Sequence, residues 1–288
     1  MFRRERRQVV TKREDAQKLL NEALKLKQKA YRILNEYHED DTTTEILDKS
    51  AVKALAVKTY QTGSILMNSY RVCSTLGTHV YVAEDLNNEG RNRKHIIKVA
   101  NKNNREWIER GYNTALELKD VAGFPKAEGL VEFGEHIFAI YEYIPGESLA
   151  NMEPANIEEI MLQLCDLLES LHSKGYIHRD IKPANVIMGM DGRVYLIDLD
   201  TVLKTDKKGI GFVDTAVGTP NYSPVELFLE GNEITFASDI YALGILYKEL
   251  VSKSQKSAKV FSKATKPNPE DRYETVQEMK EAIQELEH

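Results

Sequence analysis

The chain has 288 residues, of which 42% are hydrophobic and 29% are charged. That length suits one large domain or two modest ones with a buried core. No apolar run approaches the ~20 residues of a membrane-spanning helix, and the charged N-terminus does not suit a signal peptide. The two cysteines, Cys73 and Cys165, are too few for a disulfide framework or a metal cluster. We therefore expect reduced thiols and a cytoplasmic protein with no membrane partner.

Charge is distributed unevenly along the chain. Residues 1–32 hold eleven Lys/Arg and four Asp/Glu, a net charge of +7, and the whole chain carries −6, so the remainder carries −13. A basic arm on an acidic body can bind an acidic partner, nucleic acid or the body itself. It can equally be a solvated helix face.

The N-terminal part reads as helical. From about Thr11 to His38 the sequence lacks Gly and Pro, and apolar residues recur at steps of three and four. A second helix is predicted from about Glu45 to Tyr60, with a capping box at Thr42. Residues 1–63 are therefore predicted to form a helical N-terminal extension.

From Ser64 the pattern changes to β-structure. It predicts strands over 65–72, 80–84 and 95–100, a helix over about 104–122, and strands over 128–134 and 137–143. The sequence after Pro145-Gly146 is mainly helical. We expect an α+β fold of residues 64–288, with a β-rich lobe over about 64–144 and a helical lobe over about 145–288.

One stretch in the helical part carries the chemistry. Residues 178–185 read HRDIKPAN, and they follow a helical run from Ile157 to Leu171. Two short apolar strands, at 186–188 and 194–197, flank a turn at Asp191-Gly192. Asp198 directly follows the second strand. This arrangement brings two acids, a lysine and an amide together, which is typical of phosphoryl transfer with Mg²⁺.

These residues resemble the eukaryotic-type (Hanks-type) Ser/Thr protein kinases, over roughly residues 65–287. Later segments strengthen the resemblance: residues 217–222 read VGTPNY, residues 224–226 read PVE, and residues 238–244 read SDIYALG. The resemblance implies a bilobal protein-kinase-like fold. It also implies an ion pair between Glu226 and Arg272, a hydrogen-bonding role for Asp239 under the HRD backbone, and contact of Thr219 with the catalytic residues.

The resemblance assigns roles to the site residues, with ATP and Mg²⁺ as cofactors and a protein as substrate. Asp180 would orient the substrate hydroxyl, and Lys182 would stabilise charge on the transferring phosphate. Asn185 and Asp198 would hold Mg²⁺. Nucleotide contacts are expected from Val80, Lys98, Glu142, Ile144 and Ile187, with Lys98 at the α- and β-phosphates.

Several positions depart from the family pattern. Cys73, Thr75 and Thr78 stand where the phosphate-covering loop has glycines, Ile96 narrows the adenine slot, and Asp200 replaces the glycine of DFG. In the family pattern an acid on the following helix pairs with the lysine at position 98. The acid's position is Thr114 here and the nearest acids are Glu109 and Glu117, so the sequence leaves open whether one of these two, or no acid, pairs with Lys98. The sequence therefore allows a second reading, a pseudokinase that binds a partner through its kinase fold and N-terminal helices.

Overall fold

The structure is a computed structural model that describes Lys18 and residues 59–87, 93–101, 105–229, 231–251 and 257–286. The predicted N-terminal helices lie outside these residues, apart from Lys18, Thr59 and Tyr60. The described chain forms two compact units. The smaller is built from residues 59–119 and 125–143, and the larger from residues 120–124 and 144–286.

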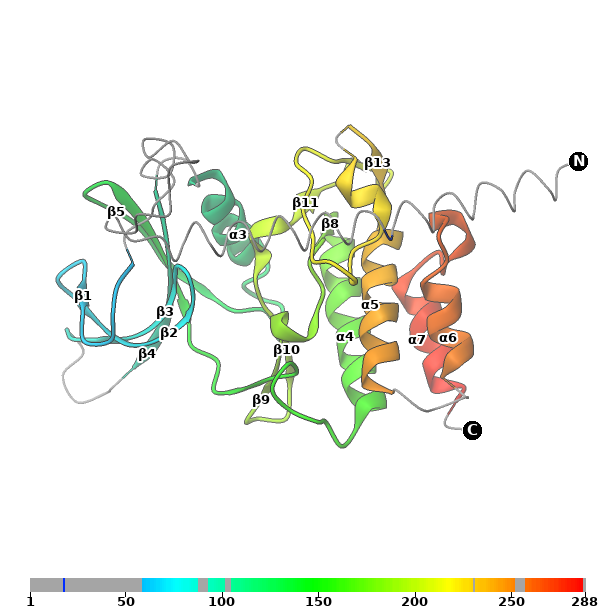
Figure 1. Cartoon of the computed structure of the whole chain (residues 1–288), viewed down its shortest axis with the longest axis horizontal. Helices are drawn as coiled ribbons and strands as arrows, with labels where there is room; N and C mark the ends of the chain where they lie inside the picture. The colour runs from blue at the N-terminus through cyan, green and yellow to red at the C-terminus, as the bar shows by residue number, and fades with distance from the viewer. Residues whose placement is uncertain are drawn as a thin grey trace, which may run out of the picture. The chain divides into compact units, whose positions relative to one another are not determined.

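The smaller unit is a six-stranded antiparallel sheet in the order β1-β2-β3-β4-β6-β5, with one helix, α3 (Figure 1). Along the chain, three main strands precede the helix and two follow it, as the sequence predicts. The bounds are β1 Ile65–Leu66, β2 Tyr70–Gly77, β3 Val80–Asp85, β4 Lys94–Asn101, α3 Arg105–Glu117, β5 Ala127–Phe133 and β6 His136–Glu142.

The two faces of this sheet have different roles. In β4, Ile97 and Val99 point into the apolar core, where they are buried with residues such as Tyr81 and Phe138. The alternate residue Lys98 points to the opposite face, because successive side chains of a strand alternate. The aromatic ring of Tyr60 closes the apolar face, at 5.8 Å from the ring centroid of Tyr81 and 6.4 Å from that of Phe138.

Two boundaries differ from the sequence prediction. The expected strand over 65–72 is interrupted, because Met67 and Asn68 adopt left-handed backbone angles (φ +49° and +59°) and turn Ile65–Leu66 back onto β2. Strand β2 then continues to Gly77. Helix α3 ends at Glu117, five residues before the expected end, and the chain reverses near Gly123 (φ +95°).

The larger unit is mainly helical (Figure 1). Helix α4, Ile157–Ser173, buries one face, which includes Leu164 and Cys165, against α5 and α7. Burial raises the pKa of Cys165 to about 12, so its thiol stays protonated at neutral pH. The remaining helices are α5 Ala237–Leu250, α6 Ala258–Ala264 and α7 Val276–Gln284.

Short strands position the loops of the larger unit. Strands β9, Val186–Gly189, and β10, Val194–Leu196, form the predicted hairpin, and β7, Gly146–Ser148, pairs with β9 on its other side. Two further pairs join β8, Tyr176–Ile177, to β11, Leu203–Lys204, and β12, Gly211–Phe212, to β13, Glu233–Ile234. A β-rich unit and a helical unit in this order confirm the expected protein-kinase-like α+β fold.

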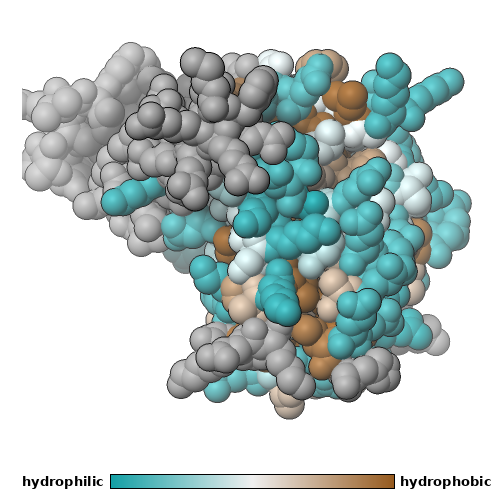
Figure 2. Space-filling model, turned by 90° about the vertical axis from the view of Figure 1, so that its right-hand side faces the viewer, coloured by the Kyte–Doolittle hydropathy of each residue, from teal (hydrophilic) through white to brown (hydrophobic). Residues whose placement is uncertain are grey.

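The face of the molecule drawn in Figure 2 is largely polar. On the face in Figure 2, the described residues are mostly hydrophilic, and hydrophobic ones form small separate areas. Within the described ranges, none of the helices combines the length and the apolar character that crossing a bilayer requires.

Candidate active site

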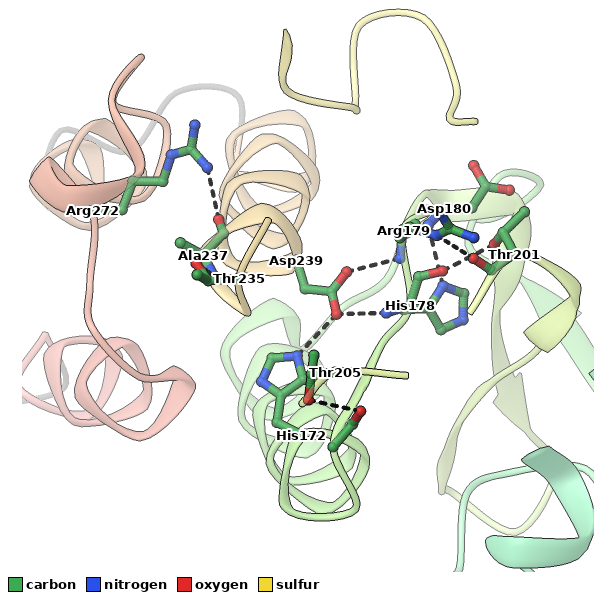
Figure 3. A network of polar contacts seen from close by, with 11 residues as sticks. His172, His178, Arg179, Asp180, Thr201, Thr205, Thr235, Ala237, Asp239 and Arg272 are labelled. Carbon is green, nitrogen blue, oxygen red and sulfur yellow. Dashed lines mark hydrogen bonds and ion pairs between the residues drawn. The ribbon is translucent and has the colours of Figure 1, made fainter. Parts of the chain in front are cut away.

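The HRD loop of the larger unit is held from below by one buried carboxylate. Asp239, near the start of α5, accepts the backbone N–H groups of His178 (2.8 Å) and Arg179 (2.9 Å) (Figure 3). Its Oδ2 also lies 2.9 Å from Nε2 of His172 on α4. Burial acts to raise the pKa of Asp239, but the hydrogen bonds and charges of the histidines outweigh it, so the pKa lies below its usual value. The expected role of Asp239 is confirmed.

Asp180 is the centre of a four-residue cluster. Its Oδ1 accepts the hydroxyl proton of Thr219 over 2.6 Å. Its Oδ2 accepts from Nζ of Lys182 (2.7 Å) and Nδ2 of Asn185 (2.9 Å). Lys182 also donates to the Thr219 hydroxyl over 2.9 Å. The structure thus brings together the three residues predicted to be catalytic, and it confirms the contact expected for Thr219.

The orientation of Asn185 suits a hard cation. Its Nδ2 donates both protons to Asp180, one to the backbone carbonyl (2.8 Å) and one to the carboxylate. The side-chain oxygen Oδ1 is therefore the atom that remains to coordinate a metal, and Mg²⁺ prefers oxygen ligands. The backbone carbonyl of Asn185 accepts the N–H of Ile197 over 2.9 Å, which places the start of Asp198 beside this loop.

No metal cluster of three or more His, Cys, Asp or Glu side chains is found among the described residues. Asn185 and Asp198 together offer an amide oxygen and a carboxylate. Mg²⁺ typically takes one or two protein ligands of this kind and completes its shell with phosphate oxygens and water. The donor set therefore fits a nucleotide-bound Mg²⁺.

Asp198 has left-handed backbone angles (φ +69°, ψ +70°) and is followed by a short 3-10 helix, Leu199–Thr201. Leu199, which stands where the DFG pattern has phenylalanine, is buried. Asp200 lies within the 3-10 helix, a right-handed conformation that any residue adopts. This explains why the chain accepts an aspartate where the family pattern has glycine.

We define the activation segment as residues 202–226. The predicted ion pair at its last residue, Glu226, is present and buried. Arg272 donates through Nη1 to Oε1 of Glu226 (2.6 Å) and through Nη2 to Oε2 (3.3 Å). The other guanidinium protons go to the carbonyls of Lys266, Pro267 and Ala237, the last of which appears in Figure 3. Ser238 also donates to Glu226.

In the smaller unit, the residues expected to contact nucleotide share one face of the sheet. Val80 and Lys98 are Cα partners in neighbouring strands, so their side chains lie on the same side. Ile96 lies on that side too, paired with Tyr141. The Nζ of Lys98 is 5.8 Å from the ring centroid of Tyr141.

The glycine-poor segment that precedes Val80 is a hairpin. Strand β2 pairs with β3 as far as the Gly77–Val80 pair, which leaves only Thr78 and His79 as the loop. The register shifts between Val72 and Ser74 and between Thr75 and Gly77. The segment is thus a strand with irregularities, and not an open glycine loop.

Helix α3 carries both acids that could pair with Lys98, Glu109 and Glu117. Thr114, 2% exposed, is on the buried face of α3, at the position where the family pattern has an acid. Glu109 pairs with Arg105 over 2.7 Å, one helical turn away. Glu117 is exposed. The buried face of α3 therefore presents a threonine to the sheet.

The remaining expected nucleotide contacts belong to separate units. Glu142, in the smaller unit, is the last residue of β6 and donates its backbone N–H to the carbonyl of Lys126 over 3.0 Å. In the larger unit, Ile144 is buried, and Ile187 lies in the middle strand β9, paired with Tyr195 and Ser148.

Sequence reasoning missed one part of the site. Arg179 is buried and forms an ion pair with Asp214 over 2.8 Å. Asp214 lies in an irregular stretch of the activation segment with no recognisable spacing to residues 178–185. The only signal was Arg179 itself, a cation beside Asp180 that needs a counter-charge when buried.

The family model of the protein kinase domain matches residues 80–287, more than half of the chain. The chain belongs to the protein kinase family. Among its relatives is a serine/threonine-protein kinase C of Synechocystis sp., 30% identical over 208 residues that cover 63% of this chain and 38% of the relative. Serine/threonine-protein kinase PknA of Nostoc sp. is 26% identical over 270 residues, which cover 76% of this chain and 48% of the relative.

A third relative is the Rho-associated protein kinase let-502 of Caenorhabditis briggsae. It is 29% identical over 176 residues, which cover 56% of this chain and 15% of the relative. The chain therefore spans less than half the length of each of these three kinases. The recognition of a Hanks-type Ser/Thr kinase sequence is confirmed.

Proposed function

We propose that this protein is an active kinase that transfers the γ-phosphoryl group of ATP to a Ser or Thr hydroxyl of a protein. The observation that carries the proposal is the cluster in which Lys182, Asn185 and Thr219 all donate hydrogen bonds to the Asp180 carboxylate. Asp198, the other residue expected to hold Mg²⁺, directly follows Ile197, whose backbone N–H donates to the carbonyl of Asn185.

The contacts suggest how the residues divide the work. The Asp180 carboxylate orients the substrate hydroxyl and accepts its proton while the hydroxyl oxygen bonds to the γ-phosphorus and the bond to the ADP oxygen breaks. Lys182 carries a positive charge 2.7 Å from Asp180 and supports the charge that develops on the transferring group. Bound Mg²⁺, held by Asn185 and Asp198, would neutralise phosphate charge.

The choice of Ser/Thr substrates is supported by Lys182 and its bond to Thr219. Both are marks of the Ser/Thr kinases that the sequence resembles, and two of the reported relatives are named as serine/threonine-protein kinases. The cytoplasmic location, and an acidic partner or nucleic acid for the basic N-terminal arm, stay predictions.

The alternative is a pseudokinase, in which the same fold binds a partner with little or no phosphoryl transfer. The hairpin that ends at Gly77, the bulky Ile96 and the buried Thr114 favour it, because they alter the nucleotide face of the smaller unit. These features bear on nucleotide binding, whereas the Asp180 cluster bears on transfer.

One experiment separates the two functions. Purified protein is incubated with Mg²⁺ and ATP labelled in the γ-phosphate, with a generic basic protein as acceptor, beside Asp180→Ala and the exposed-site control Asp120→Asn. An active kinase labels the acceptor, Asp180→Ala does not, and Asp120→Asn does. A wild type that neither transfers phosphate nor melts at a higher temperature with ATP and Mg²⁺ would contradict the proposal.

A further inference from the structure

Arg179, the residue before Asp180, is a buried cation. Its side chain is 0% exposed. A guanidinium stays charged at any pH at which proteins fold, so its burial has to be offset by a counter-charge and by hydrogen bonds. Nε donates to the carbonyl of Thr201 over 2.5 Å, and Nη1 donates to Oδ1 of Asp214 over 2.8 Å.

These two partners belong to segments that the site needs in place. Thr201 ends the 3-10 helix that follows Asp198, and its hydroxyl donates back to the carbonyl of His178 over 2.9 Å (Figure 3). Asp214 lies 35 residues after Arg179, in the activation segment. Arg179 therefore links two segments to the catalytic loop: the 3-10 helix that follows Asp198, through Thr201, and the activation segment, through Asp214.

The Asp214 carboxylate also orders its own neighbourhood. The oxygen that meets Arg179 accepts the N–H of Thr215 over 2.8 Å. Four residues further on, Thr219 bonds to Asp180 and Lys182. The stretch from 214 to 219 is thus fixed to the catalytic loop at both ends, by an ion pair at one end and by hydroxyl hydrogen bonds at the other.

We propose that Asp214 is a positioning residue, which holds the activation segment on the catalytic loop through Arg179 without phosphorylation of that segment. The physical reason is that the anion that neutralises the buried guanidinium is part of the chain, so no added phosphate has to supply the charge. The consequence for catalysis rests on the proposed function, whereas the anchoring itself does not.

The first arm of the test needs no activity. Protein co-expressed with a phosphatase, and shown by intact mass to carry no phosphate, is compared by hydrogen exchange of peptides that cover residues 211–220. Asp214→Asn keeps an oxygen for Thr215 and removes only the charge. We expect protected amides in the wild type and exchange about tenfold faster or more in Asp214→Asn, since the buried cation is left without its counter-charge.

Two further variants complete this arm. Asp214→Glu restores the carboxylate and should recover protection relative to Asp214→Asn. Glu233→Gln removes a negative charge from an exposed position of β13 and should exchange as the wild type does. Equal protection in the wild type and Asp214→Asn, or protection that arises only once Thr215 is phosphorylated, would overturn the proposal.

The second arm measures phosphoryl transfer by the same phosphate-free proteins. We expect the wild type and Glu233→Gln to be active from the first turnover, and kcat of Asp214→Asn to fall about tenfold or more. A lag that ends when the wild type becomes phosphorylated in residues 202–226 would refute phosphate-independent anchoring. If no protein transfers phosphate although exchange behaves as expected, the proposed function fails and the anchoring role stands.

Discussion

Thr219 donates its hydroxyl proton to Oδ1 of Asp180 over 2.6 Å, across 39 positions of the sequence. The same hydroxyl oxygen accepts a hydrogen bond from Nζ of Lys182. One side chain of the activation segment is therefore hydrogen-bonded to both Asp180 and Lys182, the residues expected to act in phosphoryl transfer. If the proposed function holds, the rate of transfer depends on this hydroxyl.

Thr219→Val keeps the shape of the side chain and removes the hydroxyl. Hydrogen bonds to charged groups contribute about 1.5–3 kcal/mol, so we expect kcat to fall by about ten- to a hundredfold. Thr219→Ser keeps the hydroxyl and serves as the control, with a rate near that of the wild type. Steady-state kinetics at saturating ATP measure the effect. Equal rates for the valine and serine variants would contradict the role assigned to the hydroxyl.

The Glu226–Arg272 pair predicts a loss of stability when one partner is removed. Both side chains are buried, and Arg272 has its remaining donors bound to backbone carbonyls. Glu226→Ala strands the guanidinium at a cost of about 3–5 kcal/mol, which lowers the melting temperature by about 6–20 °C in a domain of this size. Differential scanning calorimetry checks this.

An exposed ion pair gives the matched control for that measurement. Asp166 pairs with Lys280 at the surface, with the carboxylate side chain 57% exposed. Such pairs contribute less than about 1 kcal/mol, so Asp166→Ala should move the melting temperature little. Similar melting shifts for Glu226→Ala and Asp166→Ala would mean that the buried pair does not anchor the end of the activation segment.

Asp239 predicts a different kind of loss. Its two carboxylate oxygens accept three hydrogen bonds, two from backbone N–H groups and one from His172. In Asp239→Asn the amide NH₂ faces a donor whichever way the amide is turned, so at least one buried donor loses its acceptor. We expect about 1–3 kcal/mol of destabilisation and a larger proportional loss of activity. Urea denaturation beside the exposed Asp120→Asn would show the difference, and identical unfolding curves would refute it.

The order of helices and strands could be predicted because it depends on local patterns. In β4, the buried residues Ile97 and Val99 stand on either side of Lys98, which is the alternating pattern of a strand. Helix α4 has apolar residues at helical spacing. The Glu226–Arg272 pair and the Asp239 contacts could be predicted because they follow motifs that resemble a known family. Exact boundaries could not, since the left-handed turn at Met67 and Asn68 has no glycine to mark it.

The contacts of Arg179 with Thr201 and Asp214 could not be predicted from the sequence. Its partners, Thr201 and Asp214, lie in irregular segments, and which acid meets a buried arginine depends on how those segments pack. The partner of Lys98 was open for a similar reason: helical phase placed Thr114 at the expected position, and neither Glu109 nor Glu117 lies on the buried face of α3.

The buried side chain of His178 should make the stability of the protein depend on pH. This residue is fully buried, and burial lowers its pKa below the ordinary value of 6.5, an effect that outweighs the nearby carboxylates. The unfolded chain therefore binds a proton near pH 6.5 that the folded chain does not bind until lower pH. The stability contribution is complete above pH 6.5 and is lost as pH falls below it. His79, whose pKa is also lowered by burial, acts with the same sign.

His178→Phe isolates this contribution, because phenylalanine fills a similar volume and does not titrate. For the wild type, we expect the free energy of unfolding in urea to fall between about pH 7.5 and pH 5, with His178 contributing up to about 1.4 kcal/mol per pH unit. The slope should be smaller in His178→Phe, with His79 responsible for part of the remainder. Asp239 does not interfere, because its lowered pKa places its own loss of stability below pH 3.8. Equal slopes for wild type and His178→Phe would show that His178 does not have the buried, neutral state assigned to it.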